Sequence, residues 1–241
     1  MLIPIQVFQD NYVWVYGRGD NPVIIVDMGE SAPVISFLQE YKLPIEVVLL
    51  THYHQDHIAG IDQFKQTFPN VNIFAPQECK NKNIDQYVLI HGQENEEIYT
   101  KNYQINIMNT GGHTKQHVCY LIDGILFCGD TLFSAGCGRV FTGDYQQMFN
   151  SLQQIKALPS ETLICPGHEY TLSNLEFALA VADDVHKKQI IFEQLEKVKK
   201  LRQENKPSLP TTLALEKEIN PFLQAKSLEE FIKLRQLKDN F

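Results

Sequence analysis

With 241 residues, 44% of them hydrophobic and 21% charged, the chain has the composition of one large globular domain or of a domain with an appendage. A net charge of −8 argues against general affinity for nucleic acid, because phosphates require a basic surface. No run of about 18 apolar residues could span a bilayer and the start lacks a basic leader, so we expect a cytoplasmic protein. The five cysteines show no CxxC spacing, which argues against a disulfide framework.

Short β-rich runs bounded by turn residues recur through the first two thirds of the chain and predict strands. These runs cover residues 22–29, 46–52, 71–76, 103–110, 118–123, 125–130 and 162–168. Two of them meet at Asp123-Gly124, a strong hairpin signal because glycine accepts a positive φ there. Between the strands, apolar residues three or four apart predict helices over residues 31–42, 57–68 and 144–158.

From about Tyr170 onward we expect no further strands. Helices are predicted over residues 174–182, 189–205 and 228–237, with the breaker stretch KPSLP at 206–210. The net charge changes sign close to this point. Residues 1–185 contain 9 Lys or Arg and 21 Asp or Glu, whereas residues 186–241 contain 12 Lys or Arg and 8 Asp or Glu. The sequence thus predicts an α/β body followed by a helical segment. The excess of basic residues in that segment indicates either a solvated helix face or a surface that attracts an anionic ligand.

The stretch THYHQDHIAG, residues 51–60, follows a buried strand run and concentrates ligand-type side chains. His52 and His54 are two positions apart, so an extended backbone places both on one side. Asp56 and His57 follow where the next helix should begin. Imidazole and carboxylate suit zinc, iron or manganese, and burying four such groups without a metal would leave costly unpaired polar atoms. The stretch therefore predicts a metal site.

THYHQDH resembles the HxHxDH signature of the metallo-β-lactamase superfamily. That resemblance implies an α/β fold, an αββα sandwich of two mixed sheets flanked by helices. In that superfamily the other ligands follow later strands, and the turns TGGHTKQH, CGDTLF and CPGHEY would supply His113, Asp130 and His168. By resemblance, one metal would be held by His52, His54 and His113 and a second by Asp56, His57 and His168, with Asp130 bridging them.

Three histidines outside these motifs are not predicted to be metal ligands. His117 lies four residues past His113, but the Gly111-Gly112 pair permits a tight turn at His113, which favours His113 as the ligand. We expect His117 to support a ligand residue or to have a structural role. His91 and His186 are interpreted as surface histidines.

Three further stretches resemble the hydroxyacylglutathione hydrolase family, also called glyoxalase II. They are GDTLFSAGCGRVFTGD at 129–144, GHEYTLSNLEFA at 167–178 and the C-terminal LRQLKDNF. The resemblance runs from DNYVWVY to the last residue and implies a metal-binding domain over 1–169 and a helical glutathione-binding domain over 170–241. Carried over by position, the substrate contacts would be Arg139, Phe141, Tyr170, Arg235 and Lys238.

This resemblance implies hydrolysis of S-D-lactoylglutathione and related 2-hydroxyacyl glutathione thioesters to D-lactate and glutathione, the second step of methylglyoxal detoxification. The cofactors would be two divalent metal ions per chain. We expect zinc, with iron or manganese as alternatives. A metal-bridging hydroxide would attack the thioester, with Asp56 orienting it, and we expect a monomer. The alternatives are a persulfide dioxygenase, a lactonase or a β-lactamase of the same superfamily, or a non-enzymatic glutathione-binding protein.

Overall fold

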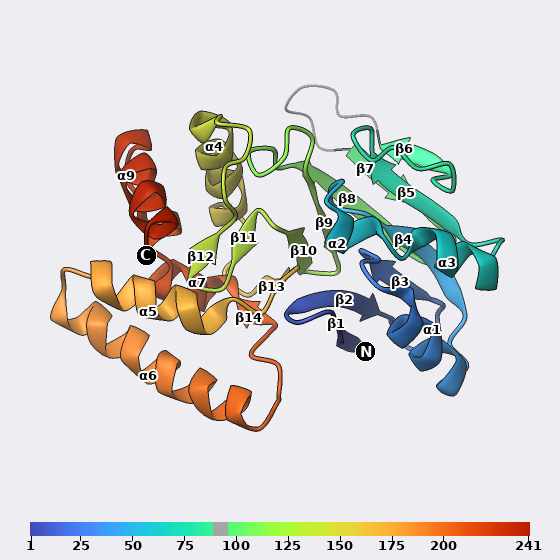
Figure 1. Cartoon of the computed structure of the whole chain (residues 1–241), viewed down its shortest axis with the longest axis horizontal. Coiled ribbons are helices and arrows are strands. Elements are labelled where there is room, and N and C mark those ends of the chain that lie inside the picture. The colour runs from blue at the N-terminus through green and yellow to red at the C-terminus, as the bar shows by residue number, and fades with distance from the viewer. Residues whose placement is uncertain (89–95) are drawn as a thin grey trace. The chain divides into compact units, whose positions relative to one another are not determined.

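The computed structural model describes residues 1–88 and 96–241 of the chain (Figure 1), and His91 lies outside them. Contacts between residues divide the chain into two units, which are described separately. Unit 1 contains Met1–Asn109 and Gln116–Asp123, and unit 2 contains Thr110–Lys115 and Gly124–Phe241. In the described residues the strands form two six-stranded sheets, ordered β1-β2-β3-β4-β5-β6 and β14-β13-β10-β9-β8-β7, and the small sheet β11-β12.

The first sheet belongs to unit 1 and is mixed, because β1, β2 and β3 are antiparallel neighbours whereas β3 to β6 run parallel. Its strands are β1 (Leu2–Val7), β2 (Asn11–Tyr16), β3 (Val23–Val26), β4 (Ile45–Leu49), β5 (Asn72–Pro76) and β6 (Gln86–Val88). Parallel strands are buried on both faces, which explains the apolar run VIIV of β3 and the buried VVL that ends β4. Helices α1 (Ser31–Glu40) and α3 (Ile61–Thr67) pack against one face through Val34, Leu38 and Phe64.

The second sheet is mixed as well. Its strands are β7 (Glu96–Tyr99), β8 (Gln104–Asn109), β9 (Val118–Ile122), β10 (Ile125–Gly129), β13 (Leu163–Pro166) and β14 (Thr211–Thr212). The pairs β7–β8, β8–β9 and β13–β14 are antiparallel, and β10 pairs in parallel with β13. Within unit 1, Tyr120 of β9 donates a hydrogen bond to the carbonyl of Leu50 just after β4, which ties the two sheets together.

The expectation that strands stop at about Tyr170 is wrong, because β14 extends the edge of β13. The preceding Leu209-Pro210 keeps the chain extended, and two β-branched threonines fit a sheet edge. All seven strands expected from the sequence are present, at slightly shorter bounds. Both sheets are mixed and accompanied by helices, and a helical segment closes the chain, which confirms the expected fold class.

The helix expected over residues 57–68 is two helices. The short α2 (Gln55–Ile58) already contains Asp56 and His57, and α3 begins after Gly60. The amide of Gly60 donates to the carbonyl of Met28, and an added Cβ at Gly60 would come within 2.7 Å of the Ser31 amide nitrogen. A close backbone approach to the end of β3 therefore breaks the helix at this glycine.

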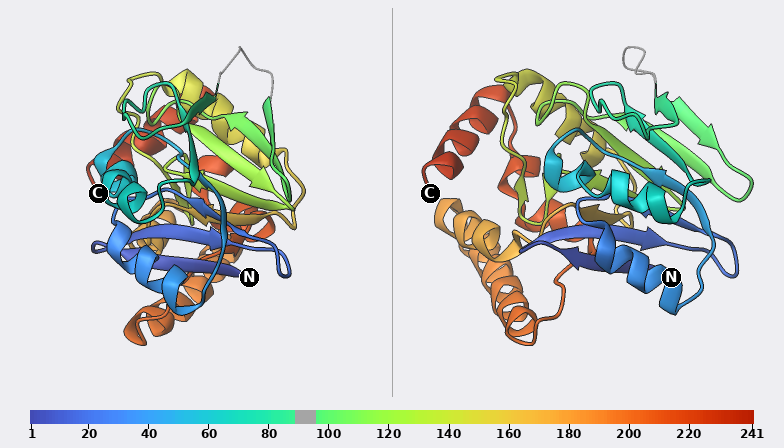
Figure 2. Two further views of the ribbon diagram at one scale, coloured as in Figure 1. Left: turned by 90° about the vertical axis from the view of Figure 1, so that its right-hand side faces the viewer. Right: turned by 45° about the vertical axis from the view of Figure 1, so that its right-hand side comes forward.

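Six helices of the described residues belong to unit 2. They are α4 (Tyr145–Lys156), α5 (Thr171–Val181), α6 (Val185–Gln203), α7 (Leu213–Ile219), α8 (Pro221–Gln224) and α9 (Leu228–Asp239). Helices α5 and α6 lie side by side (Figures 1 and 2) and share a core of Leu175, Ala178, Leu195 and Val198. Asp184 caps α6 by accepting a hydrogen bond from the amide of Lys187. Within 1–88 and 96–241, no helix has the length and apolar character needed to cross a membrane.

Candidate metal centre

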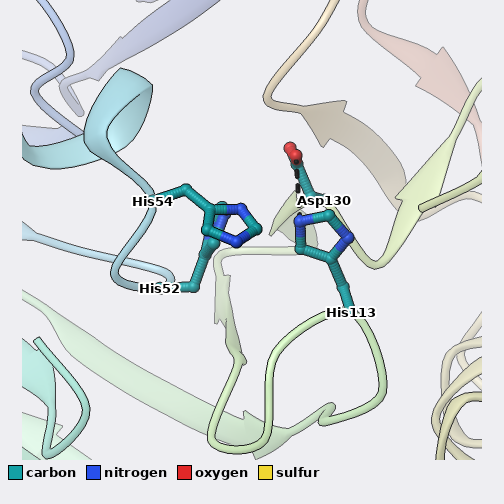
Figure 3. Close-up of side chains that lie close together, drawn as sticks. All are labelled: His52, His54, His113 and Asp130. Atoms are coloured by element: carbon teal, nitrogen blue, oxygen red, sulfur yellow. Dashed lines mark hydrogen bonds and ion pairs between the residues drawn. The ribbon is translucent and has the colours of Figure 1, made fainter. Parts of the chain in front are cut away.

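Unit 1 carries the first group of ligand-type side chains, which lie after β4 and within α2. Figure 3 shows His52 and His54 of this group. Nε2 of His52 lies 3.0 Å from Nδ1 of His54, and the rings of His52 and His57 are 4.1 Å apart. Oδ2 of Asp56 lies 3.5 Å from Nε2 of His57. The structure thus brings together the four side chains of THYHQDH that the sequence singled out, with His52 and His57 buried.

Nδ1 of His52 and Nδ1 of His57 have oxygen partners. Nδ1 of His57 lies 2.8 Å from Oδ2 of Asp27, and Nδ1 of His52 lies 3.0 Å from Oγ1 of Thr51. Thr51 itself donates to Asp27 through its amide and its hydroxyl. Because a proton on Nδ1 leaves the lone pair on Nε2, this arrangement is typical of histidines that bind a metal through Nε2.

Asp27 is a residue that the sequence interpretation missed. It directly follows β3, is buried, and has a φ of 64°, which is uncommon for a residue other than glycine. Strained backbone of this kind persists where the surroundings hold it, often at functional sites. The available signal was an acidic side chain at the end of the buried run PVIIV, in the same position relative to its strand as Asp130.

Unit 2 carries the second group, which is centred on Asp130. Oδ2 of Asp130 lies 3.4 Å from Nε2 of His113 and 3.4 Å from Nε2 of His168, and all three side chains are at most 8% exposed. Figure 3 shows the contact between His113 and Asp130 as a dashed line. Nδ1 of His113 lies 2.8 Å from the carbonyl oxygen of Arg139, which again leaves Nε2 for a ligand.

The fold explains why these three residues meet. Asp130 follows β10 and His168 follows β13, and the ends of two adjacent parallel strands lie at one edge of a sheet. His113 stands in the turn after β8, where Gly112 has a φ of 134° and a Cβ there would lie 2.5 Å from Cβ of Met148. The glycine pair before His113 therefore permits a turn that no larger residue could form.

His117 is buried in unit 1, with its ring stacked on His52 at 4.8 Å. The ring thus contacts a ligand-type histidine, and the supporting or structural role expected for His117 stays a prediction. His186, at the start of α6, is exposed.

The donors of both groups fit a hard or borderline divalent cation. They are imidazole nitrogens and carboxylate oxygens, and no thiolate is among them. All five cysteines are buried and free of disulfides. Such a donor set suits zinc, iron or manganese.

Three cationic candidates for substrate binding lie in unit 2 around the end of α9. Arg235 is only 5% exposed, and it donates to the carbonyl of Cys137 at 2.8 Å and pairs with Oδ1 of Asp239 at 3.0 Å. Nε of Arg139 lies 3.4 Å from the same oxygen, while 59% of its side chain is exposed. Nζ of Lys238 donates to the carbonyl of Ser173, and burial together with the nearby Arg235 lowers the pKa of this lysine.

The two aromatic candidates border the second ligand group. The ring of Tyr170 stacks on His168 at 4.5 Å with an interplanar angle of 12°. Phe141 is 62% exposed and lies edge-on to His113 at 5.3 Å. The guanidinium of Arg139 lies 5.9 Å from the Phe141 ring centre. All five residues expected to contact substrate are therefore in unit 2.

Comparison with known proteins covers the whole chain. Residues 6–168 match the sequence model of the Metallo-beta-lactamase superfamily, and residues 169–241 match that of the Hydroxyacylglutathione hydrolase C-terminus. The hydroxyacylglutathione hydrolase of Haemophilus ducreyi is 46% identical over 98% of this chain and 97% of its own. Those of Actinobacillus pleuropneumoniae serotype 5b and Klebsiella pneumoniae are 45% and 41% identical, covering 100% and 98% of this chain and 99% and 91% of their own.

Solved structures agree on the fold. The BLEG-1 B3 metallo-beta-lactamase has a TM-score of 0.68 at 21% identity, over 93% of this chain and 99% of its own. ETHE1 from Myxococcus xanthus has a TM-score of 0.68 at 22% identity, over 96% of this chain and 90% of its own. At these identities the likeness concerns the fold alone.

Proposed function

This chain belongs to the hydroxyacylglutathione hydrolase family of the metallo-β-lactamase superfamily, and we propose that it hydrolyses S-D-lactoylglutathione and related 2-hydroxyacyl glutathione thioesters. The products are D-lactate, or the corresponding hydroxy acid, and glutathione. The observation that carries the proposal is similarity over the full length to hydrolases of this name, C-terminal segment included. A division into domains at residues 169 and 170 is part of the proposal and is supported by the adjoining family matches.

We propose that the two ligand groups form one binuclear site. One metal would be held by His52, His54 and His113 and the other by Asp56, His57 and His168, and Asp130 would be a ligand shared by both. Divalent metals in such a site lower the pKa of water and polarise a carbonyl oxygen.

The chain's own residues complete the reaction. Asn11 donates a hydrogen bond of 2.9 Å to Oδ2 of Asp56, which fixes the carboxylate that orients the attacking water. The leaving thiol has an ordinary pKa of about 8.5, so it departs as a thiolate with little help from an acid. Hydrolysis of a thioester therefore does not require a side chain that protonates the leaving group.

Glutathione brings carboxylates, which suit the cations around α9. We assign Arg139, Arg235 and Lys238 to those carboxylates and Phe141 and Tyr170 to apolar contact with the substrate. Asp239 already neutralises part of the charge of both arginines, so it holds their guanidinium groups in place.

Arg139→Met tests this assignment with little risk to folding, since most of the side chain is exposed. Loss of one charge-assisted hydrogen bond is worth about 1.5 to 3 kcal/mol, so KM should rise roughly 10- to 100-fold while kcat changes little. Arg18→Met removes a comparably exposed arginine, paired with Asp123 in unit 1, and should leave KM unchanged. Equal KM values for the Arg139 variant and the wild type would remove this residue from the substrate site.

The whole proposal is tested by steady-state hydrolysis of S-D-lactoylglutathione with metal quantified on the same sample. We expect about two metal ions per chain. A chelator should abolish activity, and zinc, iron or manganese should restore it. Two bound metals without thioesterase activity would contradict the function and direct the search to lactones and β-lactams.

The monomeric state and the cytoplasmic location also remain proposals. Size-exclusion chromatography with light scattering tests the first, and fractionation of the source cells tests the second.

A further inference from the structure

The hairpin of β11 (Leu132–Phe133) and β12 (Gly136–Cys137) has an unusual loop residue. Its two strands pair Leu132 with Cys137 and Phe133 with Gly136, which leaves Ser134 and Ala135 as the loop. Ala135 is fully buried and has a φ of 55°. Glycine is the residue normally found where a turn requires positive φ. The local sequence alone therefore does not favour this turn, and other contacts must hold it.

Those contacts come from Glu216, a buried residue of α7. One carboxylate oxygen, Oε1, accepts from Oγ of Ser134 at 2.7 Å, and Oε2 accepts from the amide of Ala135 at 2.7 Å. The side chain is 0% exposed. This burial raises the pKa of Glu216, although its hydrogen bonds act to lower the pKa. A carboxyl group so deeply buried is costly unless it is hydrogen-bonded. Here its partners are the two residues of the loop and Nδ2 of Asn220, which donates to Oε2 at 3.3 Å.

Two asparagines complete the support. Nδ2 of Asn220, which follows α7, donates to the carbonyls of Phe133 and Gly136 at 3.1 and 3.0 Å. Nδ2 of Asn174 in α5 donates to the carbonyl of Ser134 at 3.1 Å. The helices of the C-terminal segment thus specify the backbone of the hairpin from Phe133 to Gly136.

The hairpin in turn presents an aromatic ring to the proposed site. Phe133 lies edge-on to His168, with ring centres 5.9 Å apart, and edge-on to Tyr170 at 5.1 Å. His168 is a proposed metal ligand and Tyr170 a proposed substrate contact. All of these residues belong to unit 2.

We propose that Glu216 is a positioning residue: by holding the loop of the hairpin, it fixes Phe133 against His168 and Tyr170. Glu216 itself contacts neither ring. The proposal rests on the proposed function for its kinetic test, and the binding of zinc gives a second test that requires no substrate.

Two variants of matched shape separate the hydrogen bonds from the volume of the side chain. In Glu216→Gln the amide oxygen can accept from the Ala135 amide and the amide nitrogen can donate to the Ser134 hydroxyl, which is also an acceptor. Glu216→Met keeps the length but leaves both loop donors buried and unpaired. We expect kcat/KM of Glu216→Met to fall about 10- to 100-fold, as a small displacement near reacting groups can do, and Glu216→Gln to stay within about threefold of the wild type.

A second substitution distinguishes positioning from loss of stability. Ala135→Gly removes the strain of the positive φ, so adding it to Glu216→Met should recover much of the lost kcat/KM. Val198→Ala, in the core shared by α5 and α6, serves as the matched control. Compared per folded chain, this variant should keep the wild-type kcat/KM although it lowers the unfolding temperature. If Glu216→Met does not fold, Ser134→Ala removes one of the two contacts and should show a smaller fall in kcat/KM.

Competition with a chelator measures the affinity for zinc directly. We expect Glu216→Met to bind zinc about 10-fold more weakly, as when an outer partner of a metal ligand is lost, and Glu216→Gln to bind it like the wild type. A folded Glu216→Met with wild-type zinc affinity and kcat/KM would overturn the proposal, as would an equal fall in Val198→Ala. Failure of the proposed function gives a different result, since the wild type would then bind zinc but not hydrolyse the thioester.

Discussion

Replacing Asp130 with asparagine should lower kcat/KM for S-D-lactoylglutathione about a thousandfold or more. Oδ2 of Asp130 lies 3.4 Å from Nε2 of both His113 and His168, so the same carboxylate oxygen is close to the proposed ligand nitrogens of two imidazoles. Asparagine has no charge, so its single acceptor oxygen is a much weaker ligand for two cations than the carboxylate oxygen that it replaces. A metal contributes several kcal/mol to the transition state, and each 1.36 kcal/mol corresponds to about tenfold in rate.

Metal analysis of the same variant checks the cause. Asp130→Asn should bind fewer metal ions per chain than the wild type, and the loss of activity should follow the loss of metal. Asp20→Asn removes an exposed carboxylate from the turn before β3 and should change neither quantity. An Asp130→Asn protein that kept two tightly bound metals would refute the bridging assignment.

Part of the ligand groups could be predicted because several of the ligands directly follow a recognisable strand. His52 and His54 follow β4, Asp130 follows β10 and His168 follows β13, and sheet edges collect such residues. The local pattern identifies the stretch from His52 to His57 as a metal site, and His113, Asp130 and His168 follow from the resemblance to the superfamily.

The supporting residues could not be predicted in this way, because their partners are distant in the sequence. Asp27 and Thr51 are 24 residues apart, and Glu216 and Ser134 are 82 residues apart. Glu216 occupies an ordinary helical position in the stretch LALEKEI, and nothing local indicates that it is buried. Likewise, Ala135 has no local feature that indicates a positive φ. Only the assembled unit shows which polar groups must be satisfied in the interior.

Asp27→Asn should weaken zinc binding about 10- to 100-fold and reduce kcat/KM correspondingly, although Asp27 is not a proposed ligand. The carboxylate of Asp27 accepts from the amide and the hydroxyl of Thr51 and lies 2.8 Å from Nδ1 of His57. An amide offers only one acceptor oxygen. If that oxygen faces His57, the NH2 group opposes the amide hydrogen of Thr51. If it faces Thr51, the NH2 group opposes Nδ1 of His57.

The second orientation also changes the tautomer of His57. An NH2 group beside Nδ1 requires a lone pair there, which moves the ring proton to Nε2 and removes the lone pair proposed to bind the metal. Asparagine tolerates a positive φ about as well as aspartate, so the backbone at Asp27, with its φ of 64°, keeps its conformation. Asp85→Asn is the control in unit 1, because Asp85 accepts from the amide of Ile73 and pairs with Lys65. That variant should lose some stability at unchanged zinc affinity, and an Asp27→Asn protein behaving in the same way would show that the orientation of His57 does not depend on this carboxylate.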